Sequence, residues 1–178
     1  MIWLAKLLLK QKVKKLQRKV RTQNFSSAKT AVIIYDASQK EDEGIVRNFA
    51  RFLKEEGLKV TTFGYYKFKD KADLPPKEEL SYYYFTSKEL NWLRQPSLES
   101  SKRVLLDQAD LLIDLNINNQ FCLQHLVALS KANFKAGGAG SYRDQACDLT
   151  IKLNPVNLDS LIKELKKYLA IINTKIAS

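Results

Sequence analysis

Short polar side chains gather after two strongly apolar segments of the chain. Asp36 and Ser38 follow the first of these segments, and Asp114 and Asn116 stand at the end of the second. In open α/β sheets, ligands bind beyond the carboxyl ends of the strands. The four residues are therefore candidates for a ligand pocket, although Asp, Asn and Ser also end strands and cap helices where no ligand binds.

A glycine-rich segment completes this candidate pocket. Gly137, Gly138 and Gly140 occupy three of four successive positions in the loop 137–141. Glycines at this density let a ligand approach the backbone and leave amides free for an anion, whereas the simpler interpretation is a tight turn. The first strand is followed by no glycine before Gly44, which disfavours the familiar phosphate and dinucleotide loops, and we predict no cofactor.

Positive charge is concentrated in residues 1–29, which we call the leader. The chain has a net charge of +11, and the leader holds nine of its 30 Lys and Arg residues and no acid. The rest of the chain is nearly neutral, with 21 bases against 19 acids. Such asymmetry points to a polyanionic partner, either nucleic acid or an anionic membrane, and the alternative is a solvated face without a partner. The candidate anion-binding residues are Lys6, Lys10, Lys12, Lys14, Lys15, Arg18, Lys19 and Arg21.

Residues 2–21 of the leader are predicted to form one basic amphipathic helix. Leu9, Val13, Leu16 and Val20 recur at helical spacing and form an apolar stripe. Lysines on the other face repel one another, so we expect the helix to need an apolar surface or an anion.

The cysteines and the single histidine offer little chemistry. Two cysteines are too few for a disulfide framework, and their spacing matches no zinc pattern, so we predict no metal. Cys122 and His125 lie one turn apart, but the apolar stripe around Cys122 favours an inert core thiol over a nucleophile. Free thiols favour the cytoplasm, no segment is apolar for long enough to span a bilayer, and an organellar presequence is an alternative interpretation of the leader.

Aromatic and basic residues are interleaved in the middle of the chain. The aromatic members are Tyr65, Tyr66, Tyr82, Tyr83, Tyr84 and Trp92, and the basic members are Lys67, Lys69, Lys88 and Arg94. Stacking surfaces beside cations hold single-stranded nucleic acid. Core packing is the favoured interpretation, because half of the side chains of a strand must face inward.

Apolar runs and helical spacings alternate along residues 30–178, which we interpret as one domain behind the leader. Strands are expected at 30–35, 58–65, 81–86, 109–115, 134–137 and 147–153, and helices at 41–56, 119–132 and 157–172. A short helix is expected after Thr86 and another around 104–106, and residues 24–27 form a linker. The fold class is therefore α/β, with a mostly parallel Rossmann-like or flavodoxin-like sheet of five or six strands and helices on both faces.

Three segments, 85–92, 109–116 and 129–137, resemble an uncharacterised bacterial family of small proteins. This resemblance extends over most of the chain and implies no established activity, so it assigns no catalytic residue. The chain is also faintly similar to the amino-terminal half of heptosyltransferase-type glycosyltransferases, in which a strand ending in Asp-Leu precedes a helix and a short basic strand with glycine.

The charge distribution leads to our first expectation for function, a non-enzymatic RNA-binding protein attached to the ribosome or its precursors. The first alternative is a membrane-surface protein anchored by the amphipathic helix. The second is an enzyme that uses the pocket at the strand ends, and the leader could also pack into a groove of a protein partner.

Overall fold

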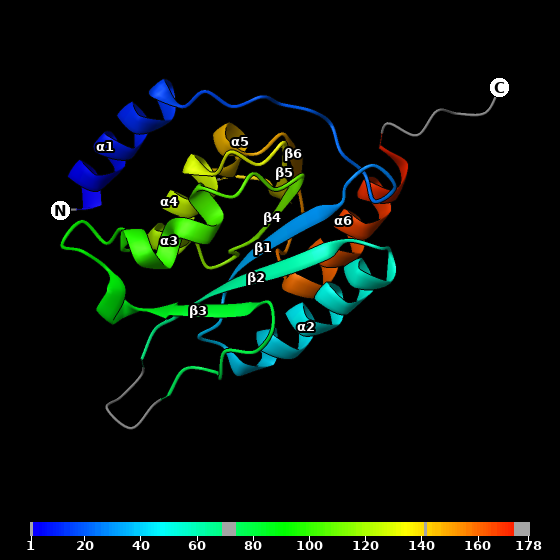
Figure 1. Cartoon of the computed structure of the whole chain (residues 1–178), viewed down its shortest axis with the longest axis horizontal. Helices are drawn as coiled ribbons and strands as arrows, with labels where there is room; N and C mark the ends of the chain where they lie inside the picture. Colours follow the sequence, from blue (N-terminus) through cyan, green and yellow to red (C-terminus); the bar gives the residue numbers. More distant parts are fainter. Residues whose placement is uncertain (1, 69–73, 141, 173–178) are drawn as a thin grey trace.

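Six parallel strands form one sheet in the computed structural model, which describes residues 2–68, 74–140 and 142–172. The strands are β1 (Thr30–Asp36), β2 (Lys59–Tyr66), β3 (Tyr82–Thr86), β4 (Leu111–Leu115), β5 (Phe134–Gly138) and β6 (Leu149–Ile151). The helices are α1 (Ile2–Lys15), α2 (Lys40–Glu55), α3 (Leu98–Leu105), α4 (Phe121–Leu129), α5 (Arg143–Ala146) and α6 (Leu158–Ile171), with a 3-10 turn, η1 (Ser87–Glu89). The strand order β3-β2-β1-β4-β5-β6 confirms the predicted α/β class (Figure 1).

The order of the strands creates a switch point between β1 and β4. The chain first builds outward from β1 through β2 to β3, then crosses back and builds β4, β5 and β6 on the other side. Ile34 pairs with Asp114 and Tyr35 with Leu115, so β1 and β4 end side by side. In sheets of this kind the crevice at the switch point is the usual place for a ligand.

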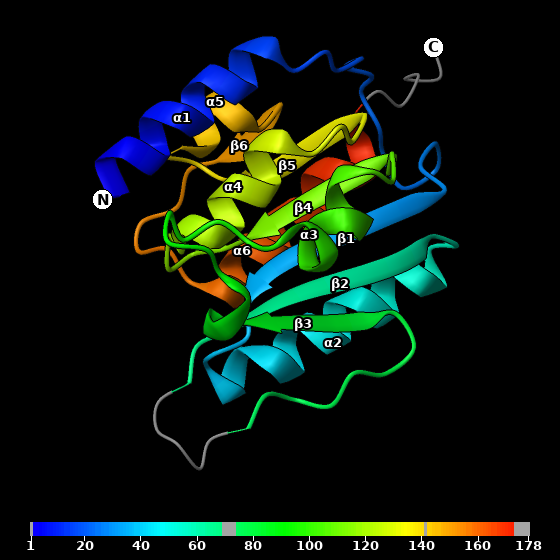
Figure 2. The ribbon, with the colours of Figure 1, turned by 60° about the vertical axis from the view of Figure 1, so that its left-hand side comes forward.

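Helices cover both faces of the sheet (Figure 2). Ile33 packs with residues of α2 and α6, including Phe49 and Leu165, on one face. Ile34 packs with residues of α3 and α4, including Leu126, on the other face. Both isoleucines are fully buried, which is why the strand is apolar at successive positions rather than alternating.

The leader lies outside α4 as an additional layer, with α1 alongside α4 and α5 (Figures 1 and 2). Ala5 and Leu9 of α1 are buried against Phe121 and Ala128 of α4. The leader helix therefore has the apolar surface that its repelling lysines were expected to require.

The predicted helix over 2–21 is wrong beyond Lys15. Leu16 N–H donates to the Val13 carbonyl at 3.0 Å, and the chain then leaves the helical path. Arg18 turns toward the domain, and Arg21 N–H donates to the Asn133 carbonyl. Tertiary contacts thus override the helical spacing of this segment.

The predicted linker at 24–27 is a turn held tightly by α6. Asn24 Nδ2 donates to the Ile172 carbonyl at 2.9 Å, and Phe25 N–H donates to the Leu169 carbonyl at 3.2 Å. The Phe25 ring meets that of Phe52 edge-on, with 5.6 Å between centroids. The turn thereby fixes the route of the leader from one face of the sheet to the other.

Several predicted elements differ in length from the observed ones. The helix expected after Thr86 is only the turn η1, because Asn91 Oδ1 accepts hydrogen bonds from Leu93 N–H and Gln95 N–H and holds a loop. The helix expected over 119–132 is α4, which begins after Asn119, whose φ of 54° is left-handed. The strand expected over 147–153 is shorter, and α5 before it was not predicted.

Among the described helices, none is long and apolar enough to cross a bilayer.

Candidate functional sites on the leader and at the carboxyl edge of the sheet

The exposed cations of the leader form the first candidate site. Seven of the eight predicted anion-binding residues are exposed and make no ion pair among the described residues, namely Lys6, Lys10, Lys12, Lys14, Lys15, Lys19 and Arg21. Five of these cations lie on α1, which is packed on α4, so they project from a fixed surface rather than from a loose tail; Lys19 and Arg21 follow α1, and the backbone of Arg21 is bound to the Asn133 carbonyl. We call this set the leader cations.

Arg18 is the exception among the eight, since it is bound to the domain. Its guanidinium forms a two-pronged ion pair with Asp148, with N–O distances of 2.8 and 2.5 Å, and Nη1 also donates to the Ala132 carbonyl at 3.0 Å. Both charged side chains are about 15% exposed, at 14% and 15%. Asp148 also accepts from Lys135 N–H, so this ion pair ties the leader to the start of β5.

Apolar side chains accompany the cations on the outer face of α1. Trp3 is 75% exposed and Leu7 41% exposed, one turn apart. Leu9, which belongs to the predicted apolar stripe, is instead buried against α4. The apolar surface that the sequence offered to a membrane is thus partly used for packing within the chain.

Asp36 and Ser38 line a cavity of about 460 Å³ at the switch point, together with Lys67 and Gln120. Asp36 Oδ1 accepts from Ser38 N–H at 3.0 Å, and its Oδ2 accepts from Gln120 Nε2 at 2.9 Å. Asn118 Nδ2 adds a longer bond of 3.2 Å to Oδ2. The buried carboxylate is held by neutral donors, an arrangement that could also accept a hydrogen bond from a ligand hydroxyl group.

Asp114 and Asn116 do not line this cavity, although they were predicted to share a pocket with Asp36 and Ser38, and they are 1% and 0% exposed. Tyr142 donates its hydroxyl hydrogen to Asp114 Oδ2 at 2.6 Å, and Asn116 Nδ2 donates to the same Tyr142 oxygen at 3.0 Å. Arg143 Nη1 is 3.9 Å from Asp114 Oδ2 and donates to the Asn116 carbonyl. Burial raises the pKa of Asp114, while the Arg143 charge opposes the shift. These groups satisfy one another inside the protein.

The three predicted glycines have structural explanations of different kinds. A Cβ on Gly137 would lie 3.0 Å from the Asp114 carbonyl oxygen and 3.2 Å from Arg143 Cδ, so the residue permits close packing. Gly140 has a left-handed φ of 92°, and its N–H donates to Asp144 Oδ1 at 2.7 Å. Gly137 and Gly138 both lie within β5, so the loop predicted over 137–141 begins only after Gly138, and Ser141 lies outside the described residues. The Gly140 amide already has an acceptor, so this one is not free for an anion.

The buried thiol and imidazole are both held in their neutral forms. Burial raises the pKa of Cys122 to about 12 and lowers that of His125 to about 4, with Lys12 adding to the second shift. Neither ring nitrogen of His125 has a hydrogen-bond partner within the described part of the chain. A buried neutral pair is poorly suited to nucleophilic chemistry. Over the same residues, no group of three or more His, Cys, Asp or Glu could hold a metal ion.

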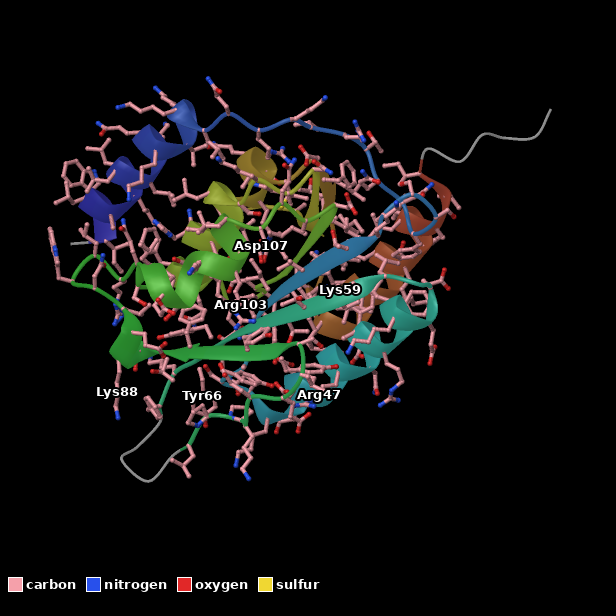
Figure 3. All side chains as sticks on the ribbon, viewed as in Figure 1. Arg47, Lys59, Tyr66, Lys88, Arg103 and Asp107 are labelled. Carbon is pink, nitrogen blue, oxygen red and sulfur yellow. The ribbon has the colours of Figure 1, made fainter. Side chains whose placement is uncertain are left out.

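Two tyrosines of β3 already make cation–π contacts with arginines of this chain. The Arg47 guanidinium lies 4.4 Å from the Tyr82 ring centroid, and that of Arg103 lies 3.9 Å from the Tyr83 centroid. Figure 3 shows Arg103 between α3 and the sheet. Of the other residues of the interleaved set, Tyr65 and Tyr66 are buried, Trp92 is exposed and Lys69 lies outside the described residues.

Sequence reasoning missed the side chains that organise the carboxyl edge. Gln120 and Asn118 were visible only as part of a polar run after a strand, which is a weak signal. Tyr142 and Arg143 gave no signal, because their partners are up to 28 residues away in the chain.

The comparisons with known proteins identify a family and no activity. Among curated proteins, no sequence matches this chain. One family model matches residues 4–172, which include nearly all of the leader and the domain. The chain therefore belongs to the family of unknown function DUF6913.

Proposed function

We propose that the chain is a non-enzymatic RNA-binding protein whose leader cations lie against phosphates of the ribosome or of one of its precursors. The observation that carries the proposal is the acid-free leader, whose exposed bases are fixed on a nearly neutral domain. A fixed array loses less conformational freedom on binding than a loose tail. The free Cys122 and Cys147 support a cytoplasmic location as part of the same proposal.

The test is the salt dependence of RNA binding. For single-stranded RNA, each phosphate contact contributes about −0.7 to the slope of log K against log salt concentration. Changing Lys10, Lys14 and Lys15 to Gln is expected to make the slope less steep by about 2 and to weaken binding at low salt. The binding of a 30-nucleotide RNA is measured by fluorescence anisotropy at several salt concentrations.

A control variant removes the same charge from a distant surface. Lys77, Lys152 and Lys163 are exposed and lie outside the leader, so their triple change to Gln is expected to leave the slope nearly unchanged. Equal slopes for the leader variant, the control variant and the wild type would refute the leader as the RNA-binding surface.

Trp3 and Leu7 support a second candidate, a membrane-surface protein. Their exposure beside lysines suits an anionic bilayer, where interfacial Trp and Lys bind together. If membrane binding is the function, Trp3→Ala with Leu7→Ala abolishes flotation with anionic liposomes and leaves RNA binding intact. If the wild type does not float with the liposomes, and RNA binding is unchanged by both substitutions, the first proposal is favoured.

The pocket around Asp36 supports an enzyme only weakly, because Asp114 and Asn116 are enclosed by Tyr142 and Arg143. The similarity to the amino-terminal half of heptosyltransferase-type glycosyltransferases, and a bacterial source, stay predictions from the sequence.

A further inference from the structure

A second cavity at the switch point differs from the Asp36 cavity in its charge. Its volume is about 280 Å³, and its walls include Lys6, Tyr65, Arg94, Gln120, Phe121 and Cys122. Lys6 comes from α1, Arg94 from the loop after η1, and the last three residues from the start of α4. Two cations from separate segments therefore face the N-terminus of one helix.

The N-terminus of α4 is the one at this edge that suits an anion. The amino end of a helix carries partial positive charge and unpaired N–H groups. The first turn of α4 contains no acid, and its N-cap residue Gln120 makes no side-chain cap hydrogen bond. In α2, which follows β1, the first turn contains Glu41, Asp42 and Glu43, and these repel an anion.

Tyr65 supplies a hydrogen-bond donor at the wall of the cavity. It is 4% exposed and lines the cavity, yet its hydroxyl group makes no hydrogen bond within the described part of the chain. The hydroxyl oxygen is not one of the fully enclosed polar atoms without a partner, so it opens onto the cavity, where it could donate a hydrogen bond to a bound acceptor. Burial raises the pKa of Tyr65 to about 12, so the group stays a donor at neutral pH.

Two nearby groups could oppose an anion, and neither fills the cavity with negative charge. Burial raises the pKa of the Cys122 thiol to about 12, so it stays neutral. Asp36 acts on Tyr65 electrostatically, but its Oδ2 accepts from Gln120 Nε2, and Asp36 lines the other cavity. Gln120 lines both cavities, with its amide hydrogen turned to the carboxylate.

We propose that this cavity binds the phosphate group of a small phosphorylated metabolite, held by Arg94, Lys6, the Tyr65 hydroxyl and the positive N-terminal end of α4. The volume is at the lower end of the roughly 300–1,000 Å³ typical of small-molecule sites, which favours a compact phosphomonoester. The buried Tyr65 at the wall favours a terminal phosphate over the backbone phosphate of an RNA strand. The site shares Lys6 with the proposed RNA surface, and its other residues lie outside that surface.

The experiment titrates the full chain with inorganic phosphate and with ribose 5-phosphate by isothermal titration calorimetry, with ribose as the uncharged control. Arg94→Gln is expected to weaken the binding of both phosphate compounds about 10-fold or more, because a charge-assisted hydrogen bond is lost. Tyr65→Phe removes only the hydroxyl group and is expected to weaken the binding of both compounds roughly 2- to 10-fold. Ribose is expected not to bind measurably.

Matched variants guard against general effects of charge and folding. Arg51→Gln removes an exposed arginine of α2, and Tyr168→Phe removes a hydroxyl from exposed Tyr168 of α6. Both are expected to bind phosphate like the wild type. Urea unfolding of all four variants confirms that the fold is retained.

The outcomes separate this proposal from RNA binding. No saturable heat with either phosphate at about 10 mM, far weaker than usual for a metabolite site, overturns the proposal. So does wild-type affinity in both Arg94→Gln and Tyr65→Phe. An Arg94→Gln variant that loses RNA and phosphate equally shows that the cavity is an RNA contact, which also overturns it. Phosphate binding without RNA binding sustains this site and refutes only the RNA surface.

Discussion

Replacing Arg18 by alanine is expected to release the middle of the leader from the domain. The guanidinium makes three hydrogen bonds, two to Asp148 and one to the Ala132 carbonyl. The segment after α1 then keeps the Arg21 bond to the Asn133 carbonyl as its nearest backbone contact with the domain. The helix itself stays anchored through Ala5 and Leu9.

The size of the effect follows from the burial and geometry of the pair. Hydrogen bonds to charged groups contribute about 1.5–3 kcal/mol each, and such contributions do not add fully. Asp148 keeps the Lys135 N–H as a donor after the substitution, so its charge is not wholly unpaired. We therefore expect the free energy of unfolding to fall by about 2–3 kcal/mol, well above the 0–1 kcal/mol of an exposed pair.

The assay is urea unfolding followed by fluorescence, with Lys19→Ala as the matched control. Lys19 is exposed beside Arg18, and its loss is expected to change stability by less than about 0.5 kcal/mol. Hydrogen exchange should also become faster in residues 16–21 of Arg18→Ala alone. If Arg18→Ala and Lys19→Ala are equally stable and exchange alike, the leader is not held by this ion pair and our account of its docking is wrong.

Three further substitutions test the packing around β5 and the carboxyl edge. Gly137→Ala is expected to lose about 1–3 kcal/mol in urea unfolding, because its Cβ would crowd a backbone oxygen, whereas Gly138→Ala, with its nearest contact at 3.6 Å, is tolerated; equal costs would contradict this. Tyr142→Phe is expected to lose about 2 kcal/mol, since a buried carboxylate loses its 2.6 Å donor, against almost nothing for Tyr168→Phe. Burial lowers the pKa of Lys135 to about 8, so above that pH the unfolded chain binds more protons than the folded one. The stability of the wild type relative to Lys135→Met should therefore rise by up to about 3 kcal/mol from pH 8 to 10.5. A stability difference that stays constant over this range would refute the lowered pKa.

The fold class was predictable because burial on both faces leaves a direct trace in the sequence. Ile33 and Ile34 face opposite helical layers, and both are apolar. The periodic apolar positions of α2 and α6 are equally plain, since both helices bury one side against the same face of the sheet. Strand ends then follow from the sheet, which is why Asp36 and Ser38 were found at a cavity.

The features that sequence reasoning missed depend on contacts between distant residues. The end of α1 depends on Arg18 meeting Asp148, and the loop after η1 depends on the Asn91 side chain holding its backbone. The anion-binding cavity needs Tyr65 and Arg94 to meet the start of α4, and no spacing in the sequence predicts that meeting. Local sequence patterns therefore predict the helices and strands of this protein, whereas tertiary contacts determine where several of them end.

The docking of the leader has a consequence for the order in which the protein is made. Arg18 and Asn24 are joined to residues 130 and 148 positions later in the chain. On a translating ribosome, where domains fold as their residues emerge, α1 can pack on α4 once residues 121–129 have been made, but Arg18 and Asn24 must wait for nearly the whole polypeptide. During that interval Arg18 has no carboxylate partner, so the nascent chain presents one more unpaired cation to nearby RNA than the folded protein does.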